Sequence, residues 1–190
     1  STLTETPTAT ATDASVCDYD IPAADSVALR DALAEAEGDG VESRICLTES
    51  TYAITGETLL VFDNDGQAII EGNNAILKND GIFNASLLNV ENATLSVQDL
   101  TLSVGNGSGE QNAVFGAGLI AISATVNLTN VDIVGGVALI GGGIYVEDAM
   151  LSLNDVVLSD NQSTGQGGGL ASLNSVISIQ GSRFASNSAT

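Results

Sequence analysis

The carboxylates are the residues of this chain with the clearest capacity for chemistry. A glycoside hydrolase uses two of them about 5–10 Å apart. Asp99 and Asp155 occupy equivalent places in two similar segments, and Asn130 occupies that place between them. Stacking at about 4.8 Å per strand would put the two aspartates about 10 Å apart. Because Asp, Asn and Gly also tolerate left-handed turns, we interpret Asp99, Asn130, Asp155 and Gly181 as a column of turn residues.

A second group of oxygen ligands lies in the segment FDNDG at residues 62–66. Asp63, Asn64 and Asp65 match part of a Ca²⁺ loop, but the closing Glu is absent at the expected spacing. We therefore expect a turn here and keep Ca²⁺ as the alternative. The sequence contains no P-loop, nucleophile elbow or Cys/His metal motif, so no other cofactor is expected.

The two cysteines and the glycosylation sequons bear on the compartment. Cys17 and Cys46 are compatible with one disulfide in an oxidising environment, which we expect, and free core thiols are the alternative. Together with the sequons they predict an extracellular or cell-surface location and covalent glycans. The candidate N-glycosylation sites are Asn84, Asn92, Asn106, Asn127 and Asn161.

The charge excludes some partners. The net charge is −20, and Lys78 is accompanied by only three Arg residues. Nucleic acid is excluded because phosphate binding needs clustered cations. No apolar run reaches transmembrane length, so we expect no membrane insertion. We interpret the acidity as a solubility device, with divalent-cation binding or adaptation to a salty environment as the alternative.

The N-terminal part divides into a tail and a cap. Residues 1–16 form a tail whose threonines alternate, which indicates either an O-glycosylated linker or an extended strand that pairs with a partner. The alternating residues are Thr2, Thr4, Thr6, Thr8, Thr10 and Thr12. Residues 17–50 form a cap with one helix at 25–37. Asp25 or Ser26 can start this helix, and Gly38 can end it. One face of the helix is expected to be apolar and consists of Val27, Leu29, Ala32, Leu33 and Ala36.

From residue 51 to 190 the chain repeats. Segments starting at Leu95, Val126, Leu151 and Ile177 place apolar residues at their first, third and eighth positions, at intervals of 31, 25 and 26 residues. The segment at 68–77 is one more copy, and the 31-residue interval fits a loop near GNGSGEQNA. The period predicts a solenoid, and the alternation of period two predicts strands. We therefore expect an all-β, parallel β-helix with coils of about 25 residues.

These repeats resemble right-handed, single-stranded parallel β-helix proteins of the polymorphic outer-membrane protein and extracellular adhesin type, which are pectate-lyase-like in fold. The matching segments are GGGIYVEDAMLSLNDVVLSDNQS and GGGLASLNSVISIQGSRFASNSA. The cap resembles their first coil at Cys17, 29–33, Cys46, 51–52 and 71–73. The glycine motif at 116–118, the acidity and the Thr-rich tail depart from the pattern.

The resemblance is specific for the fold and leaves several functions open. Polysaccharide lyases of this fold would imply Ca²⁺ ligands beside a base, but the chain has no His, and Arg183 is the only basic residue from position 95 onward. We expect a non-enzymatic structural or adhesive protein, with a carbohydrate-binding or polysaccharide-degrading β-helix as the alternative. The helix caps one end, and the open sheet edge at the other end needs a cover, either more of the same chain or another copy. If the cover is another copy, we expect head-to-tail assembly into a filament or surface layer.

Overall fold

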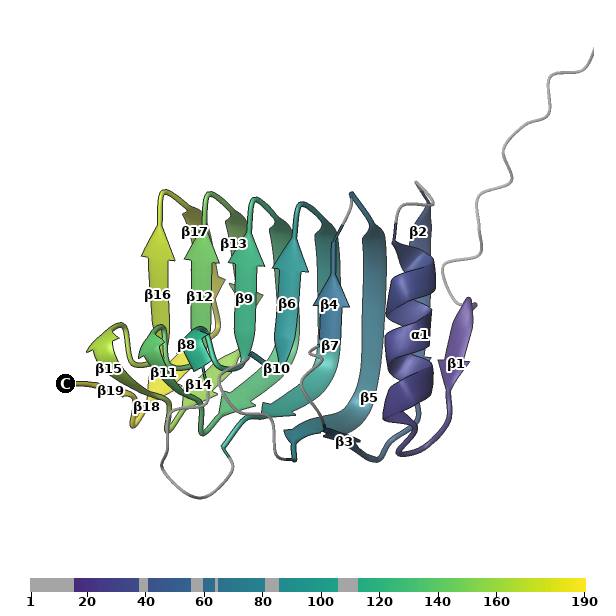
Figure 1. Ribbon diagram of the computed structural model, residues 1–190, viewed down its shortest axis with the longest axis horizontal. Helices are drawn as coiled ribbons and strands as arrows, with labels where there is room; N and C mark the ends of the chain where they lie inside the picture. Colours follow the sequence, from purple (N-terminus) through teal and green to yellow (C-terminus); the bar gives the residue numbers. More distant parts are fainter. Residues whose placement is uncertain (1–15, 38–40, 56–59, 64, 81–85, 106–112) are drawn as a thin grey trace, which may run out of the picture.

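The computed structural model shows a right-handed β-solenoid with one helix across its N-terminal end (Figure 1). It describes residues 16–37, 41–55, 60–63, 65–80, 86–105 and 113–190. The coils number about six and repeat every ~26 residues, so the predicted fold class is confirmed. The alternating threonines of the tail and most of the segment GNGSGEQNA lie outside the described residues.

Three parallel sheets form the walls of the solenoid. Sheet A contains β1 (Tyr19–Ile21), β2 (Glu42–Leu47), β3 (Thr51–Ile54), β5 (Gln67–Asn79), β7 (Thr94–Ser103), β10 (Thr125–Val134), β13 (Met150–Asn154), β14 (Val157–Ser159), β17 (Val176–Gln180) and β18 (Arg183–Ala185). Sheet B contains β4 (Leu60–Phe62), β6 (Leu88–Glu91), β9 (Leu119–Ile122), β12 (Ile144–Glu147) and β16 (Leu170–Leu173). Sheet C contains β8 (Ala113–Phe115), β11 (Val137–Ile140), β15 (Gln162–Gln166) and β19 (Ser188–Ala189).

The register stacks equivalent residues of successive coils, as the repeat period predicts. Val126 pairs with Leu95 on one side and Leu151 on the other, and Leu151 pairs with Ile177. Side chains alternate along a strand, so these positions point inward in every coil. The first, third and eighth positions of the three segments before the last one are at most 2% exposed and form the core: Leu95, Val97, Leu102, Val126, Leu128, Ile133, Leu151, Leu153 and Leu158.

Helix α1 (Ser26–Ala36) closes the N-terminal end of this core. Asp25 caps it, since its Oδ1 accepts a hydrogen bond of 2.9 Å from the Ala28 backbone N–H. The helix buries Leu29, Ala32, Leu33 and Ala36 against the first coil. Val27 was wrongly assigned to this face: it is 62% exposed, because it lies two residues, or roughly 200°, around the helix from Leu29.

Candidate functional site

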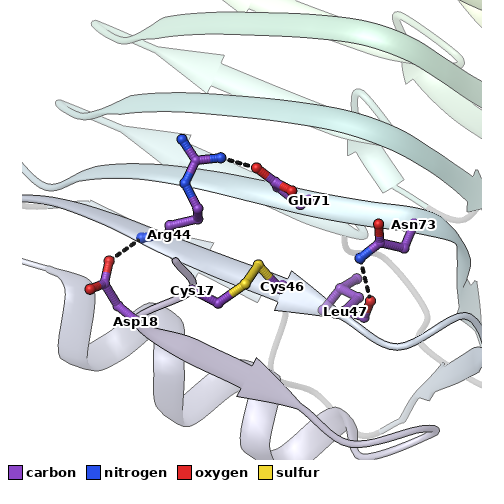
Figure 2. Close-up of polar contacts among 7 residues, drawn as sticks. All are labelled: Cys17, Asp18, Arg44, Cys46, Leu47, Glu71 and Asn73. Atoms are coloured by element: carbon purple, nitrogen blue, oxygen red, sulfur yellow. Dashed lines mark hydrogen bonds and ion pairs between the residues drawn. A yellow bond between two sulfur atoms is a disulfide. The ribbon is translucent and has the colours of Figure 1, made fainter. Parts of the chain in front are cut away.

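The disulfide joins the start of the cap to strand β2 at its end. Cys17 and Cys46 are bonded with their Cα atoms 5.8 Å apart, so the expected pairing is confirmed (Figure 2). The next residue, Asp18, is held to the same strand. Its backbone N–H donates to the Arg44 carbonyl at 2.9 Å, and the Arg44 N–H donates to Asp18 Oδ2 at 2.7 Å. The bridge therefore fixes β1 along β2.

An ion pair and an amide extend this network to the next coil, and the sequence reasoning did not find them. The Arg44 guanidinium bonds the Glu71 carboxylate across the β2–β5 pair (Figure 2). Asn73 Nδ2 donates to the Leu47 carbonyl at 2.9 Å. Asp20 lies close to the two cysteines, and these three are the one grouping in the described part of the chain with metal-ligand spacing. Because both sulfurs are consumed by the disulfide, we assign the cluster a structural role.

The predicted turn residues stand at a corner of the solenoid within sheet A. Asp99, Asn130, Asp155 and Gly181 have φ of 53°, 52°, 54° and 62°. The sequence reasoning missed three further left-handed columns, which the same repeat spacing could have shown. The first lies between sheets B and A at Asp65, Asn92, Ser123, Asp148 and Asn174. The second precedes sheet B at Gly116, Gly141 and Gly167, the last two with φ of 66° each. The third lies between sheets A and C at Gly135, Asp160 and Ser186, with φ of 76°, 53° and 55°.

The carboxylates of the turn column contact neighbouring coils. Asp99 Oδ1 accepts a hydrogen bond of 2.6 Å from Asn130 Nδ2. A Cβ on Gly181 would meet Asp155 Oδ1 at 2.1 Å, so a larger residue at this position would require the Asp155 side chain to move. Asp99 and Asp155 therefore serve as corner residues on separate coils, with Asn130 between them.

A polar hollow of about 110 Å³ adjoins this corner. Its lining combines corner residues with the strands that follow them: Asn74, Asp99, Leu100, Thr101, Asn130 and Asp132. Small-molecule sites in proteins enclose roughly 300–1,000 Å³ and are mostly apolar. The hollow is smaller and more polar than such a site.

The FDNDG segment makes a turn in its described part. The Gly66 N–H donates to the Asp63 carbonyl at 3.2 Å, and the Asp63 N–H donates to Glu37 Oε1 at 3.2 Å. Asp65 is exposed and has a φ of 62°. Asn64 lies outside the described residues. Asp63 and Asp65 are not part of the one metal-spaced grouping in the described chain, so Ca²⁺ binding here stays a prediction.

The sequons differ in accessibility. Asn92 is exposed at a corner, and Asn127 is half-buried on the outer face of sheet A, with Nδ2 3.4 Å from Ser96 Oγ. Asn84 and Asn106 lie outside the described residues. Asn161 is 0% exposed. The fold therefore leaves no room for a glycan on Asn161, and this candidate is corrected.

Asn161 instead hydrogen-bonds three coils together. Its Oδ1 accepts from the Gly136 N–H at 2.9 Å, and its Nδ2 donates to the Ile133 carbonyl at 3.0 Å. Asn187, one coil later, accepts from both the Asn161 N–H and Nδ2, at 3.0 and 3.1 Å. The 26-residue offset between these two asparagines is the signal that could have identified them as stacked.

Two aromatic residues gather outside the core. The rings of Phe115 and Tyr145 lie with centroids 4.6 Å apart, and the Tyr145 hydroxyl donates to Glu147 Oε2 at 2.9 Å. Burial, followed by that hydrogen bond, raises the pKa of Tyr145. Phe115 covers the Tyr145 ring, which is 7% exposed. This pair is too covered to act as a flat platform for sugar stacking.

The last coil, residues 167–190, exposes side chains that earlier coils bury; we call it the terminal coil. Ile177, Ile179 and Phe184 continue the inward columns of Leu151, Leu153 and Leu158. Ile179 is 52% exposed and Phe184 is 44% exposed, because no described strand lies over them. In Figure 1 the edge strands β16, β17, β18 and β19 lie at the end opposite α1.

The fold defines the protein as a parallel β-solenoid of about six turns with a helical N-terminal cap. No family model, curated protein or solved structure matches the chain. In the described residues, no helix is long and apolar enough to span a membrane.

Proposed function

We propose that this chain is a non-enzymatic structural or adhesive β-solenoid that works outside the cell, of the polymorphic outer-membrane protein and adhesin type, and assembles through its terminal coil. The observation that carries the proposal is the regular stacking of about six coils in one register, which continues to the edge strands that bear Ile179 and Phe184. Covering a large apolar side chain contributes about 1.5–3 kcal/mol. An edge strand also presents unpaired N–H and C=O groups. Both effects favour added strands at this end, supplied either by further coils of the same chain or by another copy.

The disulfide in the cap supports a location outside the cell. A disulfide persists in oxidising environments and is rare where thiols are kept reduced. Asn92 is an exposed sequon at a corner, where a glycan projects away from the stacked sheets. Both features support an extracellular or cell-surface role with glycans on the sides of the solenoid.

The alternative function is carbohydrate binding or cleavage. The polar hollow beside Asp99 and Asp132 is the observation that favours it. The hollow encloses only about 110 Å³, and the Tyr145 ring is covered. Both observations support carbohydrate binding less than the terminal coil supports assembly. The net charge of −20 would also repel an acidic polysaccharide.

The experiment is sedimentation of the purified chain, with the disulfide intact, across a range of concentrations. We expect association that strengthens with concentration and with salt, since salt screens the repulsion between acidic copies. A parallel assay follows reducing-sugar release from neutral and acidic polysaccharides. A monomer at every concentration that cleaves a polysaccharide would overturn the proposal in favour of the alternative.

A further inference from the structure

Asp20 adds a carboxylate to the two cysteines of the cap. One ligand atom from each of Cys17, Asp20 and Cys46 lies within 4.8 Å of the other two. Thiolates and carboxylates are ligands that Zn²⁺ takes at about 2.0–2.3 Å. The three side chains therefore match a zinc site in chemistry and in separation once the two sulfurs are no longer bonded to each other.

The backbone holds these ligands together without the sulfur–sulfur bond. Asp20 is the parallel register partner of Cys46 in the β1–β2 pair. Two hydrogen bonds between Asp18 and Arg44, at 2.9 and 2.7 Å, fix the residue that follows Cys17 to the same strand. Reduction of the disulfide removes neither the strand pairing nor these hydrogen bonds, so the three ligands stay adjacent.

One side of this grouping is open to solvent. Cys46 is 8% exposed, Cys17 is half-buried and Asp20 is exposed. Glu71 is the register partner of Cys46 on its other side, but the Arg44 guanidinium binds its carboxylate (Figure 2). Three protein ligands and one water therefore complete the four-coordinate geometry that Zn²⁺ prefers.

We propose that, in the chain whose disulfide is reduced, Cys17, Asp20 and Cys46 bind one Zn²⁺ that ties β1 to β2 in place of the disulfide. A dithiol reductant breaks the S–S bond by exchange, supplies two electrons and two protons, and becomes a disulfide itself. Zn²⁺ then replaces the two thiol protons, because the thiolate is the form that ligates a metal. The sulfurs move to about 3.8 Å apart, as two ligands at about 2.3 Å from a tetrahedral metal require.

The zinc site acts before the disulfide has formed. A protein that functions outside the cell is made where thiols are kept reduced. Zn²⁺ stabilises the folded cap during that interval, because it binds the folded state. Exchange with an oxidised dithiol later forms the disulfide, reduces that partner and releases the metal. This role rests on the proposed extracellular location, whereas the metal site itself does not.

Calorimetric titration with Zn²⁺ tests the site on the full 190-residue chain after reduction with a phosphine, which becomes the phosphine oxide. We expect one Zn²⁺ per chain and the release of about two protons per Zn²⁺. The oxidised chain is the control and should not bind the metal in this way, because its sulfurs are bonded to each other. Cd²⁺ should give the ultraviolet charge-transfer band of cadmium–thiolate bonds in the reduced chain alone.

Asp20→Asn tests the carboxylate ligand. Even substitutions outside the ligand shell weaken metal binding by about 10–100-fold, so the loss of this ligand should weaken Zn²⁺ binding by at least about tenfold. Asp31→Asn is the matched control, since it removes the same charge from an exposed position on α1 and should leave the affinity unchanged. Zn²⁺ should also slow proteolysis near β1 in the reduced parent chain.

Four results would overturn the inference. Equal Zn²⁺ binding by the oxidised and reduced chains would place the metal on surface carboxylates. One Zn²⁺ per two chains would show that thiolates of different copies share the metal. Equal affinities of Asp20→Asn and Asp31→Asn would exclude the carboxylate ligand. Proteolysis near β1 that Zn²⁺ does not slow would show that the metal does not replace the disulfide.

Discussion

Two buried polar side chains, Asn161 and Ser163, differ in whether they have hydrogen-bond partners inside the solenoid. Asn161 is fully hydrogen-bonded inside the solenoid, whereas Ser163 Oγ is buried and has no hydrogen-bond partner. Ser163 stands in a column between Ala138 and Ala189. A sequon motif contains no information on whether Asn161 points inward, which is why the sequence suggested a surface glycan at this position.

Asn161→Ala and Ser163→Ala should therefore have opposite effects. The first leaves the Gly136 N–H and the Ile133 carbonyl buried without partners, and we expect a loss of about 2–4 kcal/mol in the free energy of unfolding. The second removes an unsatisfied hydroxyl and completes an alanine column, so stability should stay level or rise by about 1 kcal/mol. Urea unfolding of both variants measures this, and equal losses would contradict the assignment.

Tyr52 predicts an alkaline limit to stability. It is fully buried, and its single hydroxyl proton is shared between the Thr48 carbonyl at 3.0 Å and the Ile21 carbonyl at 3.2 Å. Burial raises the pKa of Tyr52. The folded state thus holds the proton more tightly than the unfolded state, whose tyrosines titrate near 10. Its contribution is complete below pH 10 and declines as the pH rises through the folded-state value.

Unfolding free energies measured from pH 8 upward should fall steeply above pH 10. In Tyr52→Phe the fall should be shallower, although the variant starts about 1–2 kcal/mol less stable because the hydroxyl's hydrogen bonds are lost. Tyr145→Phe controls for the second tyrosine with a raised pKa. A slope in Tyr52→Phe as steep as that of the parent chain would assign the alkaline effect elsewhere.

The elements were largely predictable, and the reasons are local. Alternation and glycine spacing located β7, β10, β13 and β17, because each coil repeats the same inward columns. Helix α1 followed from Asp25 and from Leu29 with its partners one turn on. The Arg44–Glu71 ion pair was not predictable, since it depends on the register between β2 and β5, and the repeats aligned in the sequence begin only at residue 68.

At the level of structural elements, the disulfide stabilises the N-terminal cap. It closes a loop of sequence separation 29, which corresponds to about 3–4 kcal/mol in the chain-entropy model. A Cys17→Ser/Cys46→Ser double variant should lose stability by that amount and should become sensitive to protease near β1. Reducing agent should reproduce the loss in the parent chain and leave the double variant unchanged; an effect on the double variant would rule out this explanation.

At the scale of the whole molecule, composition and fold explain different properties. The repeat fixes the solenoid, while all the acids lie before residue 161 and the coil formed by residues 167–190 carries none. The total charge of −20 hides this uneven distribution, and head-to-tail assembly stays a prediction. Helix α1, with Asp31 and Glu35 outward, adds exposed carboxylates at the N-terminal end.

The equivalent glycines Gly141 and Gly167 make one coil a removable unit. Deleting residues 141–166 joins Ile140 to Gly167 at the same corner with the same backbone conformation. Asn187 would then take the place of Asn161 beside Gly136, so the buried hydrogen bonds are kept. We expect the shortened chain to fold with an unchanged circular-dichroism spectrum per residue; an unfolded product would contradict this equivalence.

Length is consequently a quantity that can change in this protein without redesign of either end. Each duplicated coil increases the distance between α1 and the terminal coil by about 4.8 Å, and each deleted coil decreases it by the same amount. The register of the other coils stays unchanged. Recombination between two copies of the glycine corner is enough to produce such a change. The number of coils, and with it the length of the solenoid, can therefore change in evolution without changes to the residues at either end.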